Sequence, residues 1–327
     1  AIRLLAQSIF LTQAFVRGLI GPPPSLILVS TSPPFAGFVG SVLAGLRSAP
    51  LAWWVMDINP DQMVASGKLP ARSLFARVFE WMNRVTLRRA ATVFTLDRFM
   101  AERLRLKYPA RPTSAVIPPW PLAAAIADES QCPAFRSRHG LDGKFLVMYS
   151  GNHAIQHPLD TLLEAARELE DEPRVVFVFV GGGAGKAAVD RRIAAGATNL
   201  RSLPPVPLDE LHDVLTAADI HVVTMGDDMV GIVHPSKIYS AMAIGRPILF
   251  FGPSESHAGE LVSEHQAGWV IRHGDAEAAV NVIREAAIGE REALSAMGKK
   301  ASDATTRSLS GQRLRSTVCD LITEGHS

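Results

Sequence analysis

Short apolar runs alternate with helix-like patterns along almost the whole chain, and this alternation constrains the fold more than any other feature. Apolar runs bounded by turn residues are typical of strands buried on both faces, and the segments between them have the period of amphipathic helices. This order is typical of βαβ units, which build parallel sheets. The sequence therefore predicts an α/β protein with doubly wound, Rossmann-like sheets.

Length favours two domains, because 327 residues exceed the size at which one hydrophobic core usually stops growing. A segment with three prolines, residues 118–121, interrupts the alternation and predicts a boundary near residue 125. We therefore expect an N-terminal domain over residues 1–125, a C-terminal domain over 126–308, and a last helix over 309–327 that packs back on the N-terminal domain.

The expected elements differ in number between the two parts. Six strands complete a doubly wound sheet in the second part, whereas the first part has four and starts in a helical pattern. We therefore expect that a first strand and helix of the N-terminal domain are missing. The last segment, 290–324, is predicted to be helical, with breaks at Gly298 and Gly311. The expected strands are 25–30, 51–56, 91–95, 114–117, 145–150, 175–180, 199–203, 220–224, 247–251 and 268–271, and the clearest early helices are 72–89 and 97–107.

Composition excludes several classes of protein. Mean hydropathy is +0.14, yet no apolar run reaches the roughly 18 residues that a spanning helix needs. Two cysteines and no C-x-x-C pair exclude a disulfide framework or a cysteine zinc site and favour a reducing compartment.

Charge is distributed unevenly. Residues 1–130 hold 14 Lys and Arg against 7 Asp and Glu, whereas the rest of the chain is acidic. A basic first domain indicates contact with something anionic, such as nucleic acid, acidic lipid or a phosphorylated small molecule. A solvated face of two helices is the alternative.

Ligands of doubly wound sheets bind where strands end and helices begin. In the second part this rule singles out Gly151 and Asn152 after one strand, Gly181 and Gly182 after the next, and a stiff loop with Pro204 and Val206.

The fourth such loop ends in His234-Pro235-Ser236-Lys237. If Pro235 takes the first helical position, the N–H groups of Ser236, Lys237 and Ile238 stay free and attract anions. With the Lys237 ammonium they form a candidate diphosphate cradle. An ordinary capped helix with a solvated lysine is the alternative.

Three other patterns carry less weight. Residues 183–188 satisfy G-x-G-x-x-A, a dinucleotide-binding pattern, but no acidic residue follows at the required distance, so tight strand-to-helix packing is the expected role. His153 and His157 lack a third metal ligand, and we expect no metal site. Asp57 directly follows a strand and faces the expected interdomain cleft, where its carboxylate could orient an acceptor hydroxyl or simply cap a loop.

With these residues in place, the second part resembles the donor-binding half of family 4 glycosyltransferases, the retaining GT-B enzymes that use nucleotide sugars. The first part, through Ser32-Pro33-Pro34 and residues 57–61, is similar to the acceptor side of bacterial enzymes that build exopolysaccharide or O-antigen. The resemblance in the second part lies in residues 149–152, 179–183, 203–207, 217–220 and 235–247.

The resemblance implies that a sugar moves from a nucleotide sugar to a hydroxyl of a glycan or lipid-linked acceptor, with retention and without a metal or cofactor. A UDP-sugar is favoured over a GDP-sugar. The implied catalytic residues are Asp57 and Lys237. The implied donor-binding residues are Gly151, Asn152, Gly181, Gly182, Pro204, Val206, His234, Ser236, Lys237 and Ser240.

The chain departs from the family at two glutamates, whose positions hold Ile232 and Ser240. A non-catalytic binding protein descended from such a transferase therefore remains an alternative. A nicotinamide-dependent oxidoreductase that uses the turn at residues 183–188 is a second alternative, which the missing ribose acid argues against. The expected location is cytoplasmic, at the inner face of the membrane, with peripheral contact to anionic lipid and none to nucleic acid.

Overall fold

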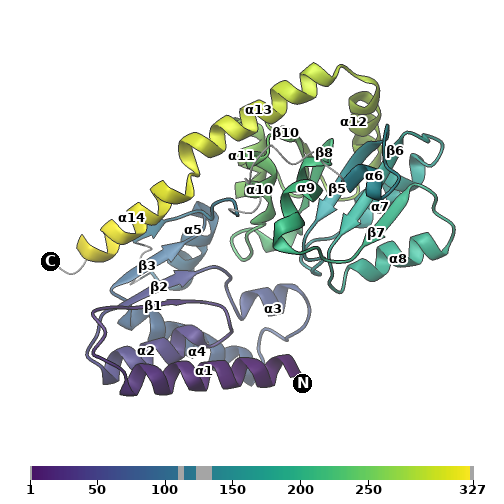
Figure 1. The fold of residues 1–327 in the computed structure, drawn as a ribbon. Coiled ribbons are helices and arrows are strands. Elements are labelled where there is room, and N and C mark those ends of the chain that lie inside the picture. Colours follow the sequence, from purple (N-terminus) through teal and green to yellow (C-terminus); the bar gives the residue numbers. More distant parts are fainter. Residues whose placement is uncertain (1, 110–113, 123–134, 325–327) are drawn as a thin grey trace. The chain divides into compact units, whose positions relative to one another are not determined.

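A computed structural model describes residues 2–109, 114–122 and 135–324 of the chain (Figure 1). The chain forms two compact units. The N-terminal unit comprises residues 1–118, 229–234 and 312–327, and the C-terminal unit comprises 119–228 and 235–311. The boundary expected near residue 125 lies outside the described residues.

The N-terminal unit is built on a four-stranded parallel sheet in the order β1-β2-β3-β4. Helices α2 and α4 cover one face, and α14 lies on the other (Figure 1). There Val318 of α14 joins a core with Ala52 and Phe94. The elements are α1 (Ile2–Ile20), β1 (Ile27–Ser30), α2 (Ala36–Leu46), β2 (Leu51–Val55), α3 (Asp61–Ala65), α4 (Leu74–Arg89), β3 (Thr92–Thr95), α5 (Arg98–Lys107), β4 (Ala115–Val116) and α14 (Gly311–Glu324).

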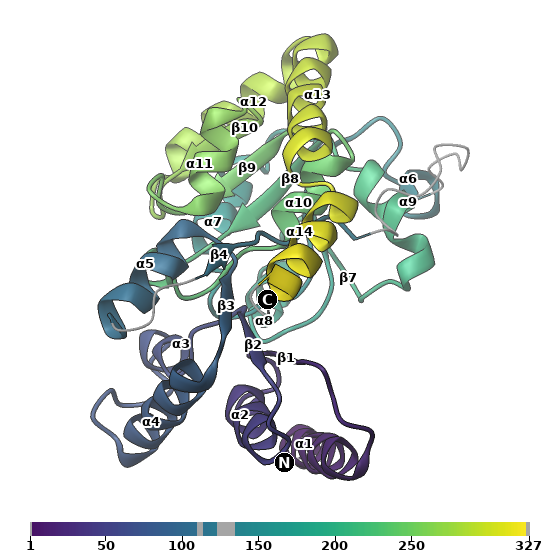
Figure 2. The ribbon, with the colours of Figure 1, turned by 90° about the vertical axis from the view of Figure 1, so that its left-hand side faces the viewer.

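Helix α1 packs against α2, as the turned view in Figure 2 shows. Two helices of this unit start at side-chain caps, because Ser73 accepts the N–H of Ala76 and Asp97 accepts the N–H of Met100.

The C-terminal unit is built on a six-stranded parallel sheet in the order β10-β9-β8-β5-β6-β7. The chain winds from β5 to one edge and returns through β8 to the other, so β5 and β8 flank the topological switch point. The elements are α6 (Phe135–Arg138), β5 (Phe145–Ser150), α7 (Asp160–Glu168), β6 (Val175–Val180), α8 (Lys186–Ala194), β7 (Leu200–Leu203), η2 (Leu208–Glu210), α9 (Leu211–Thr216), β8 (Ile220–Thr224), η3 (Asp227–Met229), α10 (Lys237–Ala243), β9 (Ile248–Phe251), α11 (His257–Glu264), β10 (Gly268–Ile271), α12 (Ala276–Ile288) and α13 (Arg291–Ser308).

Both faces of this sheet are buried, which explains why its strands are continuous apolar runs. Val147 and Tyr149 of β5 point into a core with α7 and α12, whereas Leu146 and Met148 point into a second core with α6 and α9. Strand β6 alternates in the same way and is buried at all six positions.

The predicted α/β architecture with two parallel sheets is confirmed, and each expected strand is present with ends shifted by at most two residues. The expected break at Gly298 is wrong. Gly298 lies inside α13, where a Cβ would collide with the carbonyl oxygen of Gly245, so its missing side chain allows α13 to pack on the end of α10. Among the described residues, no helix is long and apolar enough to cross a bilayer.

Candidate functional site

A cavity of about 410 Å³ opens at the C-terminal ends of β5 and β6, next to the switch point of the C-terminal unit. Its volume is in the range of small-molecule sites. The walls are mostly backbone and apolar side chains, which leaves room for a ligand to approach the main chain closely. The lining residues are Ser150, Gly151, Asn152, Val180, Gly181, Gly182, Pro205, Val206 and Leu211.

Glycines allow the two loops of this cavity to interlock. Gly181 and Gly183 have φ angles of 131° and 130°. A Cβ on Gly181 would collide with the carbonyl oxygen of Gly151, and one on Gly183 would lie 2.6 Å from that of His153. The N–H of His153 donates to Gly182 O (2.8 Å), and Gly185 N–H donates back to His153 O (2.7 Å). Gly183 and Gly185 thus pack against the loop that follows β5.

Lys237, the first residue of α10, lies at the edge of this cavity. Its Nζ lies 3.7 Å from the centroid of the Tyr149 ring, and a Cβ on Gly151 would lie 3.7 Å from the same atom. Within the described part of the chain this buried ammonium has no hydrogen-bond partner. Because burial disfavours the charged form, the pKa of Lys237 falls to about 7.

Two histidines lie near the lysine. His153 is fully buried and packs against Tyr149 with the rings tilted and their centroids 4.7 Å apart. Nδ1 of His157 donates to the carbonyl oxygen of Thr224 (2.7 Å) at the end of β8. Burial, and secondly the charge of Lys237, lowers the pKa of each histidine to about 4. Both are therefore neutral at pH 7.

The start of α10 differs from the expectation. The helix begins at Lys237 after Ser236, and Ile238 N–H donates to Pro235 O (3.2 Å), so it is not free for an anion. Ser236 is exposed and Ser240 is buried in the helix. A seven-residue helix has a weak dipole, so the lysine side chain is the principal attraction for an anion here.

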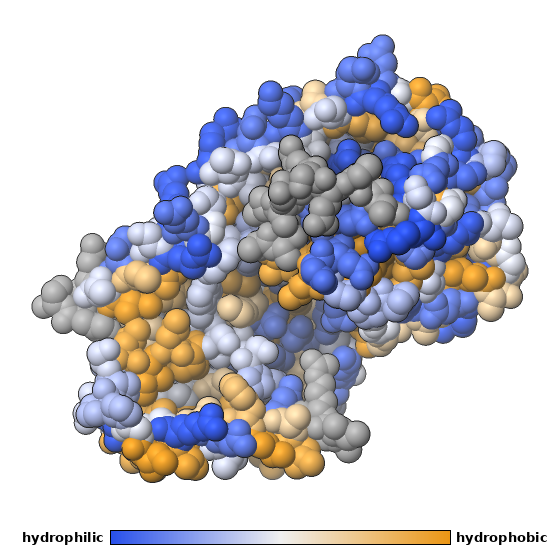
Figure 3. All heavy atoms as spheres, viewed as in Figure 1, coloured by the Kyte–Doolittle hydropathy of each residue, from blue (hydrophilic) through white to orange (hydrophobic). Residues whose placement is uncertain are grey.

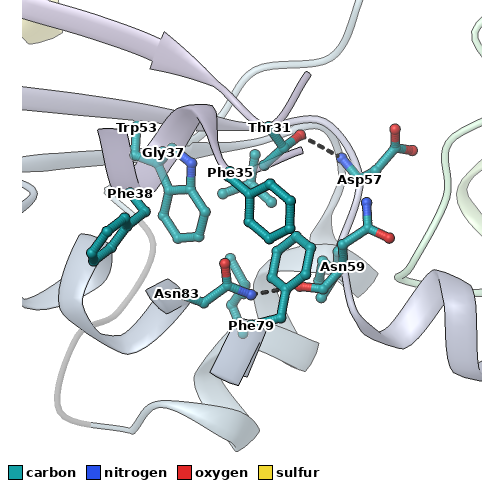
Figure 4. Close-up of a pocket in the computed structure, with 12 residues that line it drawn as sticks. Thr31, Phe35, Gly37, Phe38, Trp53, Asp57, Asn59, Phe79 and Asn83 are labelled. Atoms are coloured by element: carbon teal, nitrogen blue, oxygen red, sulfur yellow. Dashed lines mark hydrogen bonds between the residues drawn. The ribbon is translucent and has the colours of Figure 1, made fainter. Parts of the chain in front are cut away.

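Asp57 lies in the N-terminal unit at the C-terminal end of β2 and lines a separate, narrow cavity of about 20 Å³ (Figure 4). Thr31 Oγ1 accepts the Asp57 N–H (3.1 Å), and Figure 4 shows the carboxylate turned away from the aromatic rings of the pocket. Phe35 and Phe79 pack with ring centroids 4.6 Å apart. Burial raises the pKa of Asp57, and the charge of His234 opposes that rise.

His234 also belongs to the N-terminal unit. Its Nδ1 lies 2.7 Å from Oδ2 of Asp97, and Ile58 N–H donates to Ile232 O (3.0 Å) in the same segment. We expected His234 among the nucleotide-binding residues because it stands three positions before Lys237. The structure places its imidazole on Asp97 instead.

Of the predicted donor-site residues, the structure brings Gly151, Asn152, Gly181, Gly182 and Val206 to one cavity, with Lys237 against Gly151. Pro204 is exposed beside it. Tyr149 and Asp97 were missed. Tyr149 stands two positions before Gly151 at the end of a strand, which is a usable signal, whereas nothing local in the sequence pairs Asp97 with His234. Within the described ranges no three His, Cys, Asp or Glu residues group as metal ligands.

Two parallel Rossmann-like sheets with a cavity at the strand ends of the second define a GT-B fold. Two family models match the chain: "Glycosyl transferase 4-like domain" over residues 3–120 and "Glycosyl transferases group 1" over residues 144–287. Both parts of the chain thus match family models of glycosyltransferases.

Two curated relatives match in sequence. WcaI of Escherichia coli (strain K12), named as a colanic acid biosynthesis glycosyl transferase, is 29% identical over 67% of this chain and 55% of its own length. WbjE of Pseudomonas aeruginosa, named as a glycosyltransferase, is 24% identical over 71% of this chain and 59% of its own length. The match thus spans less than two thirds of either relative.

Solved structures share the fold at low identity. HepE of Anabaena, in complex with UDP-glucose, matches with a TM-score of 0.76 and 16% identity over 96% of this chain and 82% of that chain. Sucrose-phosphate synthase of Thermosynechococcus elongatus matches with a TM-score of 0.69 and 16% identity over 97% of this chain and 77% of that chain.

Proposed function

We propose that this chain is a glycosyltransferase that moves a sugar from a nucleoside diphosphate sugar to a hydroxyl of a glycan or lipid-linked acceptor. The observation that carries the proposal is the buried Lys237 ammonium without a hydrogen-bond partner among the described residues, at the edge of a cavity made of glycine backbone. A diphosphate fits this arrangement, because it supplies negative charge and accepts hydrogen bonds from the main chain.

The donor is assigned to the C-terminal unit. Loops at Gly151 and Gly181 would hold the diphosphate close to the backbone, and Val206 and Pro205 offer an apolar wall for the base. Complexes of HepE with UDP and UDP-glucose support a UDP-sugar. As the sugar–phosphate bond breaks, Lys237 stabilises the charge that develops on the leaving diphosphate, so that neither a metal ion nor a cofactor has to supply that charge.

The acceptor is assigned to the N-terminal unit at Asp57. Its carboxylate would orient the acceptor hydroxyl while the hydroxyl oxygen forms the new glycosidic bond, the sugar–phosphate bond breaks and the hydroxyl proton passes to the leaving diphosphate. The proposal includes retention of the anomeric configuration of the sugar, which the resemblance to family 4 glycosyltransferases implies. Ser240, in the place of one family glutamate, is buried in α10, and Ile232, in the place of the other, is 1% exposed.

We place the protein in the cytoplasm at an anionic membrane surface. The 56 residues before Asp57 contain no Asp or Glu. Helix α1 exposes apolar side chains along its length (Figure 3), and α4 exposes more of them beside Arg77, Arg84 and Arg88. Apolar side chains mixed with arginine are typical of helices that lie on acidic lipid. The exposed apolar residues are Leu5, Ile9, Phe10, Val16, Leu19 and Ile20 of α1, and Leu74, Phe75, Val78 and Trp81 of α4.

The test is release of nucleoside diphosphate from UDP-, GDP- and ADP-sugars in the presence of lipid-linked glycans. We expect turnover with one donor class. Asp57→Asn should lower turnover by about 10²–10⁴-fold and leave donor binding unchanged. Donor binding without turnover for any acceptor would favour the non-catalytic alternative, and binding of NADH alone would favour an oxidoreductase.

A further inference from the structure

Among the described residues, the charged and titratable groups around the Lys237 ammonium include no carboxylate that could compensate its positive charge. Tyr149 of β5 lies under it, and the loop after β5 contributes His153 and His157. Lys186 of α8, whose Nζ donates to the carbonyl oxygens of Gly181 and Leu203, adds a second positive charge next to His153. Within the described ranges no carboxylate forms an ion pair with Lys237.

A buried ammonium in such surroundings is costly, because only the face of one aromatic ring offsets the lost hydration. His153 has the same problem, since both of its ring nitrogens are buried and have no hydrogen-bond partner in the described part of the chain. The surroundings therefore favour a neutral amine beside neutral imidazoles in the free protein. A dianionic ligand reverses this preference, because it supplies both the missing charge and the missing acceptors.

We propose that this cavity binds a nucleoside diphosphate together with a proton, which Lys237 takes up as its amino group leaves the Tyr149 ring for the diphosphate. This inference rests on the proposed function of the site. The proton comes from solvent, and no bond other than N–H is formed or broken. Donor binding is consequently coupled to pH: the lysine has to gain a proton above neutral pH, and it already carries that proton at pH 6.

Calorimetric titration with UDP-glucose in buffers of different ionisation enthalpy measures the coupled proton directly. UDP-glucose suits the test because its phosphates stay fully ionised over the pH range used. Since the pKa of Lys237 is about 7, uptake should rise from roughly 0.1 proton per ligand at pH 6 to roughly 0.9 at pH 8, and affinity should fall about eightfold between pH 7.5 and 8.5. GDP-mannose and ADP-glucose are titrated in parallel.

The matched control is Lys237→Arg, because a guanidinium stays protonated. Its uptake should be close to zero at pH 8 and its affinity should be nearly independent of pH. Binding by the wild type without proton uptake at pH 8 would overturn the inference and leave the proposed function standing. No binding of any sugar nucleotide would overturn both.

A second readout needs no ligand. The folded protein releases the Lys237 proton near pH 7, whereas the unfolded chain keeps it to about 10.5, so stability should rise with pH between these values. The thermal midpoint of the free protein, measured against Lys237→Met, should therefore increase from pH 7 to pH 9. A constant difference between the two proteins would mean that the lysine stays charged and would contradict the inference.

Discussion

Nδ1 of His234 lies 2.7 Å from Oδ2 of Asp97, and the two side chains are 1% and 4% exposed. The other carboxylate oxygen, Oδ1, accepts the N–H of Met100 (2.7 Å) at the start of α5. Asp97 therefore caps a helix and fixes the segment that precedes α10 in the chain. Asp97 thus joins two segments that lie 137 positions apart in the chain.

Asp97→Ala should destabilise the N-terminal unit by about 3–5 kcal/mol, since removing one partner of a buried pair leaves the other without compensation. Urea unfolding measures the change. Asp275→Ala is the control, because Asp275 caps α12 at the surface and its loss should cost only about 1 kcal/mol. Equal losses in the two variants would show that the His234 contact contributes nothing.

Gly181→Ala should destabilise the C-terminal unit by about 2 kcal/mol or more, because it combines a positive φ with a collision against Gly151 O. The neighbouring Gly182→Ala is the matched control. Its Cβ would meet only the Pro205 ring, at an ordinary 3.6 Å, and stability should change little. Urea unfolding of both variants checks the prediction, and similar losses would mean that the two loops are less tightly interlocked than the structure shows.

The protein should lose stability in mild acid. Burial lowers the pKa of His221 to about 4 from an ordinary value of 6.5, so the unfolded chain binds more protons between these values. The contribution of a neutral, buried histidine to the free energy of unfolding is thus present above pH 6.5 and is lost as pH falls toward 4. At pH 5 this loss of stability is about 2 kcal/mol. His153 and His157 act in the same direction.

His221→Gln separates this contribution, because an amide can still donate to Leu215 O, the partner of His221 Nε2 at 2.8 Å. The free energy of unfolding of this variant should fall less between pH 7 and pH 5 than that of the wild type. If both proteins showed the same slope, His221 would not be the source of the acid sensitivity.

Trp81→Glu should reduce binding to vesicles that contain acidic lipid severalfold. Trp81 is 54% exposed on α4, and a carboxylate there both removes apolar area and repels the lipid head groups. Ile288→Glu, at a 75% exposed position on α12 in the other unit, is the control and should bind as the wild type does. Sedimentation with vesicles measures both, and an equal loss in the two variants would contradict the assigned surface.

The positions of the strands and their burial on both faces could be predicted from the sequence, because such strands are continuous apolar runs, as in residues 175–180. The loops of the donor cavity could be predicted for a related reason: a parallel sheet places its strand ends at one edge, so Gly151 and Gly181 had to lie together. These inferences need only local pattern and topology.

The other features depend on tertiary contacts that leave no local trace. Residues 229–234 stand next to α10 in the chain, yet they pack in the N-terminal unit through Asp97 and Ile58. Gly298 has the local signature of a helix break and lies inside a helix, since contact with Gly245 requires a glycine there. The neutral surroundings of Lys237 likewise become visible only when Tyr149 and His153 are placed around it.

Thermal unfolding with UDP, GDP, ADP and NADH side by side tests the central claim, that the cavity next to Lys237 binds a nucleoside diphosphate. At about 100 times its dissociation constant the specific nucleotide should stabilise the fold by roughly 2.7 kcal/mol. The account predicts such a shift with UDP or another diphosphate, and its loss in Lys237→Ala. A shift that survives in Lys237→Ala, or one seen with NADH alone, would contradict the account.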